Sequence, residues 1–125
     1  MDEDALREIF AGIEPVSLRR MFGGVGIYHQ CLIVGVALRG TVMLKGDETA
    51  ARVWEAEGAE RWHYAGKKRP VAMPYWSIPD AVMDEPERLA EWTRAAFAAA
   101  ARIADNEAAL SLLEEPRRSS SRKRR

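Results

Sequence analysis

The sequence predicts an α+β fold: an antiparallel β-meander sheet of about five strands, flanked by an N-terminal helix, a middle helix and a long C-terminal helix. Two observations lead to this prediction. Residues 25–44 contain three short apolar runs separated by turn-sized gaps, a pattern typical of strands joined by hairpins. The flanking segments carry helix caps and apolar residues at helical spacing. We expect one globular domain at residues 1–115 and a disordered basic tail at residues 116–125.

The first three strands are expected at residues 25–28, 32–38 and 41–44, with turns at residues 29–30 and 39–40. All three runs are rich in β-branched and aliphatic residues, which favour strands. The second run is almost wholly apolar, which predicts a central strand covered on both faces.

Two further strands are expected at residues 61–64 and 71–76, joined by a basic turn at residues 66–69. Proline has no amide hydrogen to donate to a neighbouring strand. Pro70 and Pro74 therefore place the second of these strands at the edge of the sheet or across a bulge.

The first two helices have recognisable ends. Residues 2–11 combine an acidic first turn with an apolar stripe, and Gly12 is placed to end the helix. Residues 15–18 are expected to be a linker. Asp47 is expected to cap the middle helix, and Gly58 to stop it.

The long C-terminal helix is expected to open at Asp84, because Glu87 follows three residues later and Pro86 lies in the first turn. Apolar residues then recur at helical spacing as far as Ile103. Three leucines after residues 105–106 predict a further helical piece.

Composition and charge are those of a globular chain, with 47% hydrophobic and 30% charged residues and a formal net charge of +0. The six basic residues after Pro116 leave 13 basic against 19 acidic residues in 1–116, a net charge of −6. An acidic body is a poor surface for nucleic acid overall. In one hypothesis the tail contacts nucleic acid weakly and without sequence readout. Its cations are Arg117, Arg118, Arg122, Lys123, Arg124 and Arg125.

The single cysteine, Cys31, cannot form an internal disulfide, and it fits a reducing compartment. Its apolar neighbours predict a small buried side chain. The acidic N-terminus does not resemble a signal peptide, and no apolar run approaches the roughly 20 residues that span a bilayer. We expect a cytoplasmic protein with no membrane contact.

Catalytic and metal-binding residues are not expected. His29 is placed in a hairpin turn and His63 in a strand, and no His, Cys or Asp spacing matches a metal site. Cys31 could be a nucleophile only with a base and an electropositive setting, and its flanking Leu32-Ile33 favours a small buried side chain instead. The sequence predicts a protein without cofactor, metal or enzymatic activity.

Two surfaces are candidates for binding. The glycines at residues 23–26 precede a strand rather than a helix, so they predict a turn or close packing instead of a phosphate loop. The segment 73–76 concentrates aromatic and flexible apolar surface, which suits a protein interface if it is exposed and a core if it is buried. The residues proposed for binding are Arg19, Arg20, Met21, Phe22, Gly23, Gly24, Lys45, Tyr75 and Trp76.

Several sequence segments, in this order and spacing, resemble the N-terminal domain of the TfoX/Sxy family. They are RRMFGGVGIY at residues 19–28, LKGD at 44–47, Tyr64 with Gly66, and PVAMPYW at 70–76 followed by Ile78-Pro79. The resemblance covers roughly residues 5–104. It implies an α+β domain and a link to competence regulators that act as co-activators beside a DNA-binding transcription factor. It implies no catalytic residues, and the second, C-terminal domain of the full-length regulators is not expected here.

The leading hypothesis is a non-enzymatic regulatory module that contacts a protein of the transcription machinery or a regulator. The first alternative is a nucleic-acid-associated protein that uses the basic tail. The second is a small-molecule-binding protein that uses the glycine turn with Arg19, Arg20 and Lys45, which requires a concave pocket. A free edge of the sheet would allow a homodimer.

Overall fold

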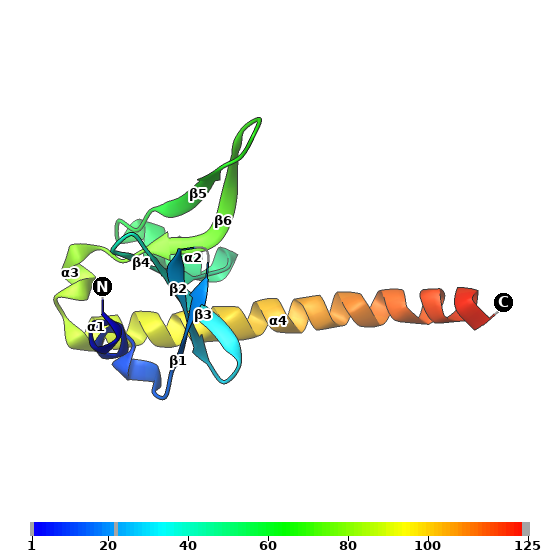
Figure 1. Cartoon of the computed structure of the whole chain (residues 1–125), viewed down its shortest axis with the longest axis horizontal. Coiled ribbons are helices and arrows are strands. Elements are labelled where there is room, and N and C mark those ends of the chain that lie inside the picture. The colour runs from blue at the N-terminus through cyan, green and yellow to red at the C-terminus, as the bar shows by residue number, and fades with distance from the viewer. Residues whose placement is uncertain (1, 22, 124–125) are drawn as a thin grey trace.

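The chain folds around one six-stranded, fully antiparallel sheet with the strand order β1-β2-β3-β4-β6-β5 (Figure 1). The computed structural model describes residues 2–21 and 23–123, with side chains as far as residue 113. The fold class is the predicted α+β class. The strands are β1 (Ser17–Met21), β2 (Gly24–His29), β3 (Leu32–Leu38), β4 (Thr41–Lys45), β5 (Arg61–Ala65) and β6 (Pro70–Ser77).

The sheet has six strands rather than about five, because β1 occupies part of the segment that the sequence assigns to a linker. Ser17 pairs with Tyr28 and Met21 pairs with Gly24. Pro15 and two consecutive arginines hide the strand, since neither is a strand signal. The alternation of Leu18 toward the core with Arg19 away from it is the only local trace.

The helices are α1 (Glu3–Ile9), a 3-10 turn η1 (Ala11–Ile13), α2 (Glu48–Ala56), α3 (Asp80–Met83) and α4 (Pro86–Lys123). Asp47 caps α2 as predicted, accepting a hydrogen bond from the Ala50 amide at 3.0 Å. Asp84 ends the short helix α3 instead of opening α4, which begins at Pro86. The leucines after residue 106 belong to α4 itself and not to a separate helix.

The backbone of α4 continues to Lys123, and the disorder expected for residues 116–125 stays a prediction. Low complexity indicates that a segment cannot bury a core of its own, and it leaves the local helix propensity open. The side chains of the basic tail lie outside the described residues.

Two hairpin turns differ in how well the sequence predicts them. Arg39 and Gly40 both have positive φ and form the expected turn. The turn between β2 and β3 is Gln30-Cys31, with φ of 49° and 70°, one residue later than predicted. As a result Cys31 is exposed rather than buried, because a left-handed turn residue directs its side chain outward from the hairpin tip. His29 ends β2 and is buried, with Nδ1 2.8 Å from the Pro15 carbonyl oxygen.

The helices cover only one face of the sheet, which we call the covered face. Its core includes the two stacked indoles of Trp54 and Trp92, with ring centroids 5.4 Å apart, and Trp76 packed edge-on against Trp54. The predicted burial of β3 on both faces is confirmed, although helices lie on only one of them: Val34 and Ala37 face the helices, and Val36, which is 6% exposed, is buried on the other side.

The β5–β6 hairpin projects from the rest of the sheet, and the C-terminal half of α4 projects in a different direction (Figure 1). β6 is not an edge strand, since it pairs with β4 on one side and β5 on the other. β5 is the edge strand. The register shift between Arg61 and His63 sets one residue of β5 opposite three of β6, residues 73–75, so the predicted bulge lies on β6 at Pro74. No helix in the described part of the chain is long and apolar enough to cross a bilayer.

Candidate functional site

The face of the sheet that no helix covers is the candidate site, and we call it the open face. A second, separate apolar cluster lies there, centred on Val36, Met43 and Tyr75. These three side chains come from neighbouring positions on β3, β4 and β6. The half-buried side chains packed around them are Ile33, Leu38, Trp62 and Met73.

Strand alternation extends the open face to the projecting hairpin. Val71 lies two residues before Met73 on β6, and it pairs with Tyr64 on β5. Tyr64 is 56% exposed and Val71 is 48% exposed. The apolar surface therefore runs from the middle of the sheet to the hairpin and becomes more accessible along the way.

Methionines supply much of this surface. Met43 and Met73 belong to the open-face cluster, and Met21 lies at the β1 end, where its sulfur borders Gly26. Methionine is unbranched and polarizable, so a surface built from it can adapt to differently shaped partners. A flexible apolar floor suits the docking of another protein better than the precise holding of a small substrate.

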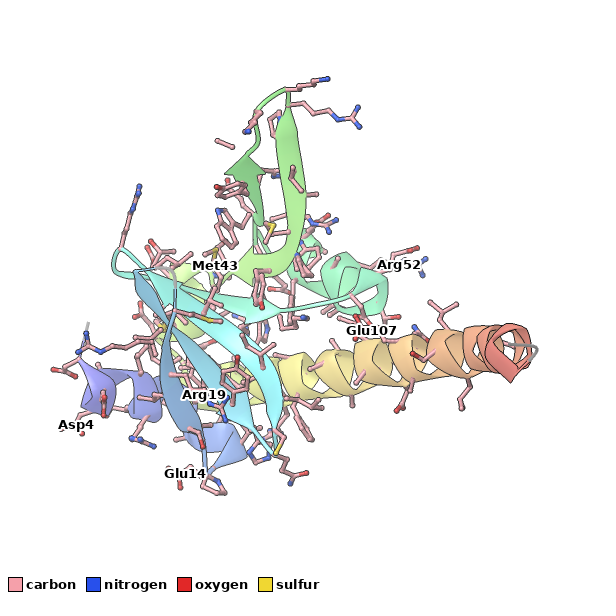
Figure 2. The ribbon with its side chains drawn as sticks, turned by 45° about the vertical axis from the view of Figure 1, so that its right-hand side comes forward. Asp4, Glu14, Arg19, Met43, Arg52 and Glu107 are labelled. Carbon is pink, nitrogen blue, oxygen red and sulfur yellow. The ribbon has the colours of Figure 1, made fainter. Side chains whose placement is uncertain are left out.

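Cations border the open face. The Arg19 guanidinium lies 4.9 Å from the centroid of the Tyr28 ring, and the Lys45 amine lies 5.4 Å from that of Tyr75. Figure 2 shows Arg19 and Met43 on the sheet and Glu107 on α4. The six strands contain no aspartate or glutamate. Strands and hairpin turns together hold eight cations: Arg19, Arg20, Arg39, Lys45, Arg61, Lys67, Lys68 and Arg69.

This distribution separates the charges of the domain, because its acidic residues lie on the helices, their caps and the connecting segments. The net charge of −6 for residues 1–116 therefore misrepresents the sheet, which is locally cationic. An acidic partner would be attracted to the sheet and repelled by the helix layer.

Two titratable groups on the open face are perturbed by burial. Burial lowers the pKa of the Lys45 amine, and the charge of Glu107 opposes that shift. Burial also raises the pKa of the Tyr75 hydroxyl, with a further contribution from Tyr28. At neutral pH Tyr75 is thus an uncharged hydrogen-bonding group beside a partly desolvated cation.

The glycine cluster serves packing and turning. Gly23 has a φ of +77°, which suits the turn between β1 and β2. A Cβ on Gly24 would collide with the Leu38 side chain and the Ala37 carbonyl oxygen. A Cβ on Gly26 would lie 2.7 Å from the Met21 sulfur. These contacts support the structural interpretation of the glycines.

The residues proposed from the sequence separate into several places. Arg19, Met21, Lys45 and Tyr75 come together on the open face. Trp76 is only 2% exposed and belongs to the covered core, where its indole donates to Glu55 Oε2 at 2.7 Å.

The other proposed residues lie away from the open-face cluster. Arg20 alternates to the side of the sheet that faces the helices. Gly23 and Gly24 lie at the β1–β2 turn. Phe22 lies outside the described residues, as do the side chains of the six tail cations.

A hollow of about 910 Å³ lies between the start of α1 and the β1–β2 and β3–β4 turns. Arg19, Arg20 and the glycine turn line it, together with Asp2 and Glu3, but Lys45 does not. No described side chain places an unpaired buried polar atom in it. Among the described residues, no three His, Cys, Asp or Glu side chains converge as metal ligands. The charged side chains that line the hollow are exposed.

Sequence reasoning missed several open-face residues, including Met43, Tyr64 and Val71. The available signal was strand alternation: once the pairing of β5 with β6 and of β3 with β4 is known, these residues fall on one face with Tyr75. The register and the hidden strand β1 could not be read from the sequence, so this common face could not be assembled.

Comparison with known proteins gives one family. The family model of the TfoX N-terminal domain matches residues 8–100 of the 125-residue chain. The matched part contains all six strands and the first part of α4. A search of curated proteins finds no match.

Proposed function

The chain belongs to the TfoX N-terminal domain family, and we propose that it is a non-enzymatic regulatory module that binds a protein partner on the open face of its sheet. One observation carries the proposal: an apolar, methionine-containing face without a covering helix has the cations Arg19 and Lys45 at its border, and its strands contain no acidic residue. Exposed apolar patches with a charged rim mark interaction sites. The partner that this chemistry fits is an acidic, amphipathic protein segment.

The resemblance to competence regulators suggests the setting of this interaction. In a competence-type role the partner would be a transcription regulator or a component of the transcription machinery. That setting is cytoplasmic, where a single exposed thiol such as Cys31 remains reduced.

The chemistry of the open face favours a protein over a nucleic acid. Valine, isoleucine and methionine form much of its floor, whereas single-stranded nucleic acids need free aromatic rings for base stacking. Of the rings on this face, Tyr28 and Tyr75 already have a cation of the same chain over them, and Trp62 packs into the apolar cluster, which leaves Tyr64 as the exposed ring. The aliphatic floor instead suits leucine-type side chains.

A site-specific cross-linking experiment in cells tests the proposal. A photo-reactive amino acid replaces Tyr64 on the open face in the full chain, and the matched control replaces Val53, which is 60% exposed on α2. We expect the Tyr64 probe to capture a different protein, and we expect Val71→Glu to abolish capture. Equal capture from both positions, or Tyr64 adducts with nucleic acid alone, would contradict the proposal.

A further inference from the structure

Helix α4 outruns the domain that it packs against. Its last firm attachment is Arg102, which donates from Nε and Nη2 to the two carboxylate oxygens of Asp47 at 2.6 and 3.0 Å. Every residue from Asp105 to Leu113 is exposed. Figure 1 shows this half of the helix projecting away from the sheet.

The projecting part continues the apolar stripe that holds α4 to the body. The residues of the buried stripe are spaced alternately three and four apart. They are Leu89, Trp92, Ala96, Ala99 and the half-buried Ile103. The same spacing leads on to Asn106, Leu110 and Leu113. Leu110 is 61% exposed and Leu113 is 68% exposed. The apolar stripe of α4 therefore extends past the last residue that packs against the domain, and its exposed end has the pattern of a contact surface.

The chain cannot supply that cover from its own open face. α4 packs on the covered face of the sheet, and the open face lies on the opposite side. A continuous helix rises about 1.5 Å per residue in a straight line and cannot turn back around the sheet. Burial of Leu110 and Leu113 therefore requires a second molecule.

A helix-to-helix dimer through this stripe alone is a poor solution. The free part of the stripe, from Ile103 to Leu113, is shorter than two heptads, and coiled coils need about three to four. Leu110 and Leu113 must therefore be buried by a surface other than a second copy of this helix stripe.

We propose that the projecting segment of α4, Asp105–Leu113, docks on the open face of a second copy of this chain. Its leucines match the accessible apolar side chains of that face, the exposed Tyr64 and Val71 and the half-buried Met73. The segment contains Asp105 and Glu107 and no cation, and the strands that receive it contain cations and no acid. Its acidic and apolar side chains are the chemistry that the open face fits.

Reciprocal docking of the two helix segments gives a closed dimer with two-fold symmetry. Each copy donates one helix segment and receives one on its own open face, so a two-fold dimer contains two identical contacts. The inference rests on the proposed function, since it uses the same face. Self-association and binding of the regulatory partner then exclude each other, and the protein concentration controls how much open face is available.

Sedimentation of the full chain, from micromolar to millimolar concentration, measures the self-association. A helix variant, Leu110→Asp with Leu113→Asp, and a face variant, Tyr64→Glu with Val71→Glu, should each raise the dimer dissociation constant about tenfold or more. Mixing the two variants should restore a heterodimer, because the intact helix of one still meets the intact face of the other. Neither a helix-to-helix nor a face-to-face dimer would show this rescue.

Two matched controls separate the interface from general damage. Leu112 is 66% exposed but lies roughly 160° around the helix from Leu110, so Leu112→Asp should leave the dimer intact. Val53→Glu on α2 should do the same. All substituted side chains are exposed, and unchanged thermal unfolding of the variants verifies their fold.

The outcomes distinguish this inference from the proposed function. A monomer at every concentration, or a dimer that only one class of variant weakens, overturns the inference. If the Tyr64 probe still captures a different protein in cells, the proposed function stands without it. If the dimer forms with rescue but the probe captures only copies of this chain, the inference stands and the regulatory partner does not.

Discussion

The two faces of the sheet are built from the same strands and yet differ in every physical respect. The covered face packs three tryptophans, Phe10 and the alanines of α4 into a continuous core. The open face holds a smaller cluster around Val36, Met43 and Tyr75, with cations at its border. The covered face therefore holds the main core. On the open face the three central side chains are also buried, and the accessible apolar side chains are Tyr64 and Val71.

The difference also shows what net charge conceals. Taken over residues 1–116, the chain is acidic, but its acids lie off the sheet and its strands carry cations alone. The long helix α4 has two parts. Its first half packs into the core of the covered face, and its second half projects beyond the domain. The following predictions test whether the two faces are as different as this description requires.

Replacing Trp54 should produce the largest effect, since its indole is 1% exposed and contacts both Trp76 and Trp92. We expect Trp54→Ala to lower the free energy of unfolding by about 3–5 kcal/mol. Urea-induced unfolding followed by circular dichroism measures the change. The matched variant Trp62→Ala, on the open face, should cost clearly less. Equal costs would mean that the two faces do not differ in their structural role.

Replacing Asp47 tests how α4 is held to the domain. Asp47→Ala removes the cap of α2 and the partner of Arg102, and should cost about 1 kcal/mol. Asp47→Asn keeps a capping side chain but removes the charge, so it should cost less.

The pH dependence of the Asp47 variants has a definite sign. The hydrogen bond from Arg102 lowers the pKa of the Asp47 carboxyl in the folded state. The stabilisation is therefore complete above the unfolded pKa of about 3.9, and it is lost as the pH falls through the lower folded pKa. The difference in unfolding free energy between the wild type and Asp47→Asn should shrink in acid. A difference that stays constant down to strongly acidic pH would contradict this.

Lys45 distinguishes charge from stability on the open face. Its folded pKa is lowered by burial, so in alkaline solution the folded state releases the proton before the unfolded state does. Stability from this group therefore rises with pH toward the unfolded pKa of about 10.4. The free energy of unfolding of the wild type should therefore rise relative to that of Lys45→Met as the pH increases across this range. If the wild type instead lost unfolding free energy relative to Lys45→Met with rising pH, burial would not be the main influence on the pKa of Lys45.

The smallest effect on stability is expected at the hairpin. Tyr64→Ala and Val71→Ala should each change the free energy of unfolding by no more than about 0.5 kcal/mol, because both side chains are half exposed. The same substitutions should weaken binding to the open face. A large loss of stability in thermal unfolding would instead assign these residues to the fold.

The sequence predicted the elements with strong local signals. The Asp47 cap, the Arg39-Gly40 turn and the basic β5–β6 turn each depend on residue types that suit one local geometry. It missed β1, whose arginines and preceding proline are not strand signals. It also placed one turn a residue early, which led to the wrong expectation for Cys31. These errors arise where long-range pairing decides the structure.

The candidate site was predicted only in part, for the same reason. Arg19, Met21, Lys45 and Tyr75 were chosen from three separate segments, and the sheet register brings them to one face. Trp76 was chosen with Tyr75 as its neighbour, but adjacent strand residues point to opposite faces. The resemblance to the TfoX N-terminal domain identified the family, but it did not indicate which face of the sheet is the candidate binding surface.

The methionine methyl groups give the most direct test that the open face is the contacting surface. Besides Met1, the chain has four methionines. Met21, Met43 and Met73 lie on the open face, and Met83 packs against the covered core. Selective methyl labelling and NMR can follow them in one sample as the protein concentration is raised or the captured partner is added. The open-face account predicts shifts at Met21, Met43 and Met73 with Met83 unchanged. Shifts at Met83 alone, or at none of the four when a complex forms, would contradict it.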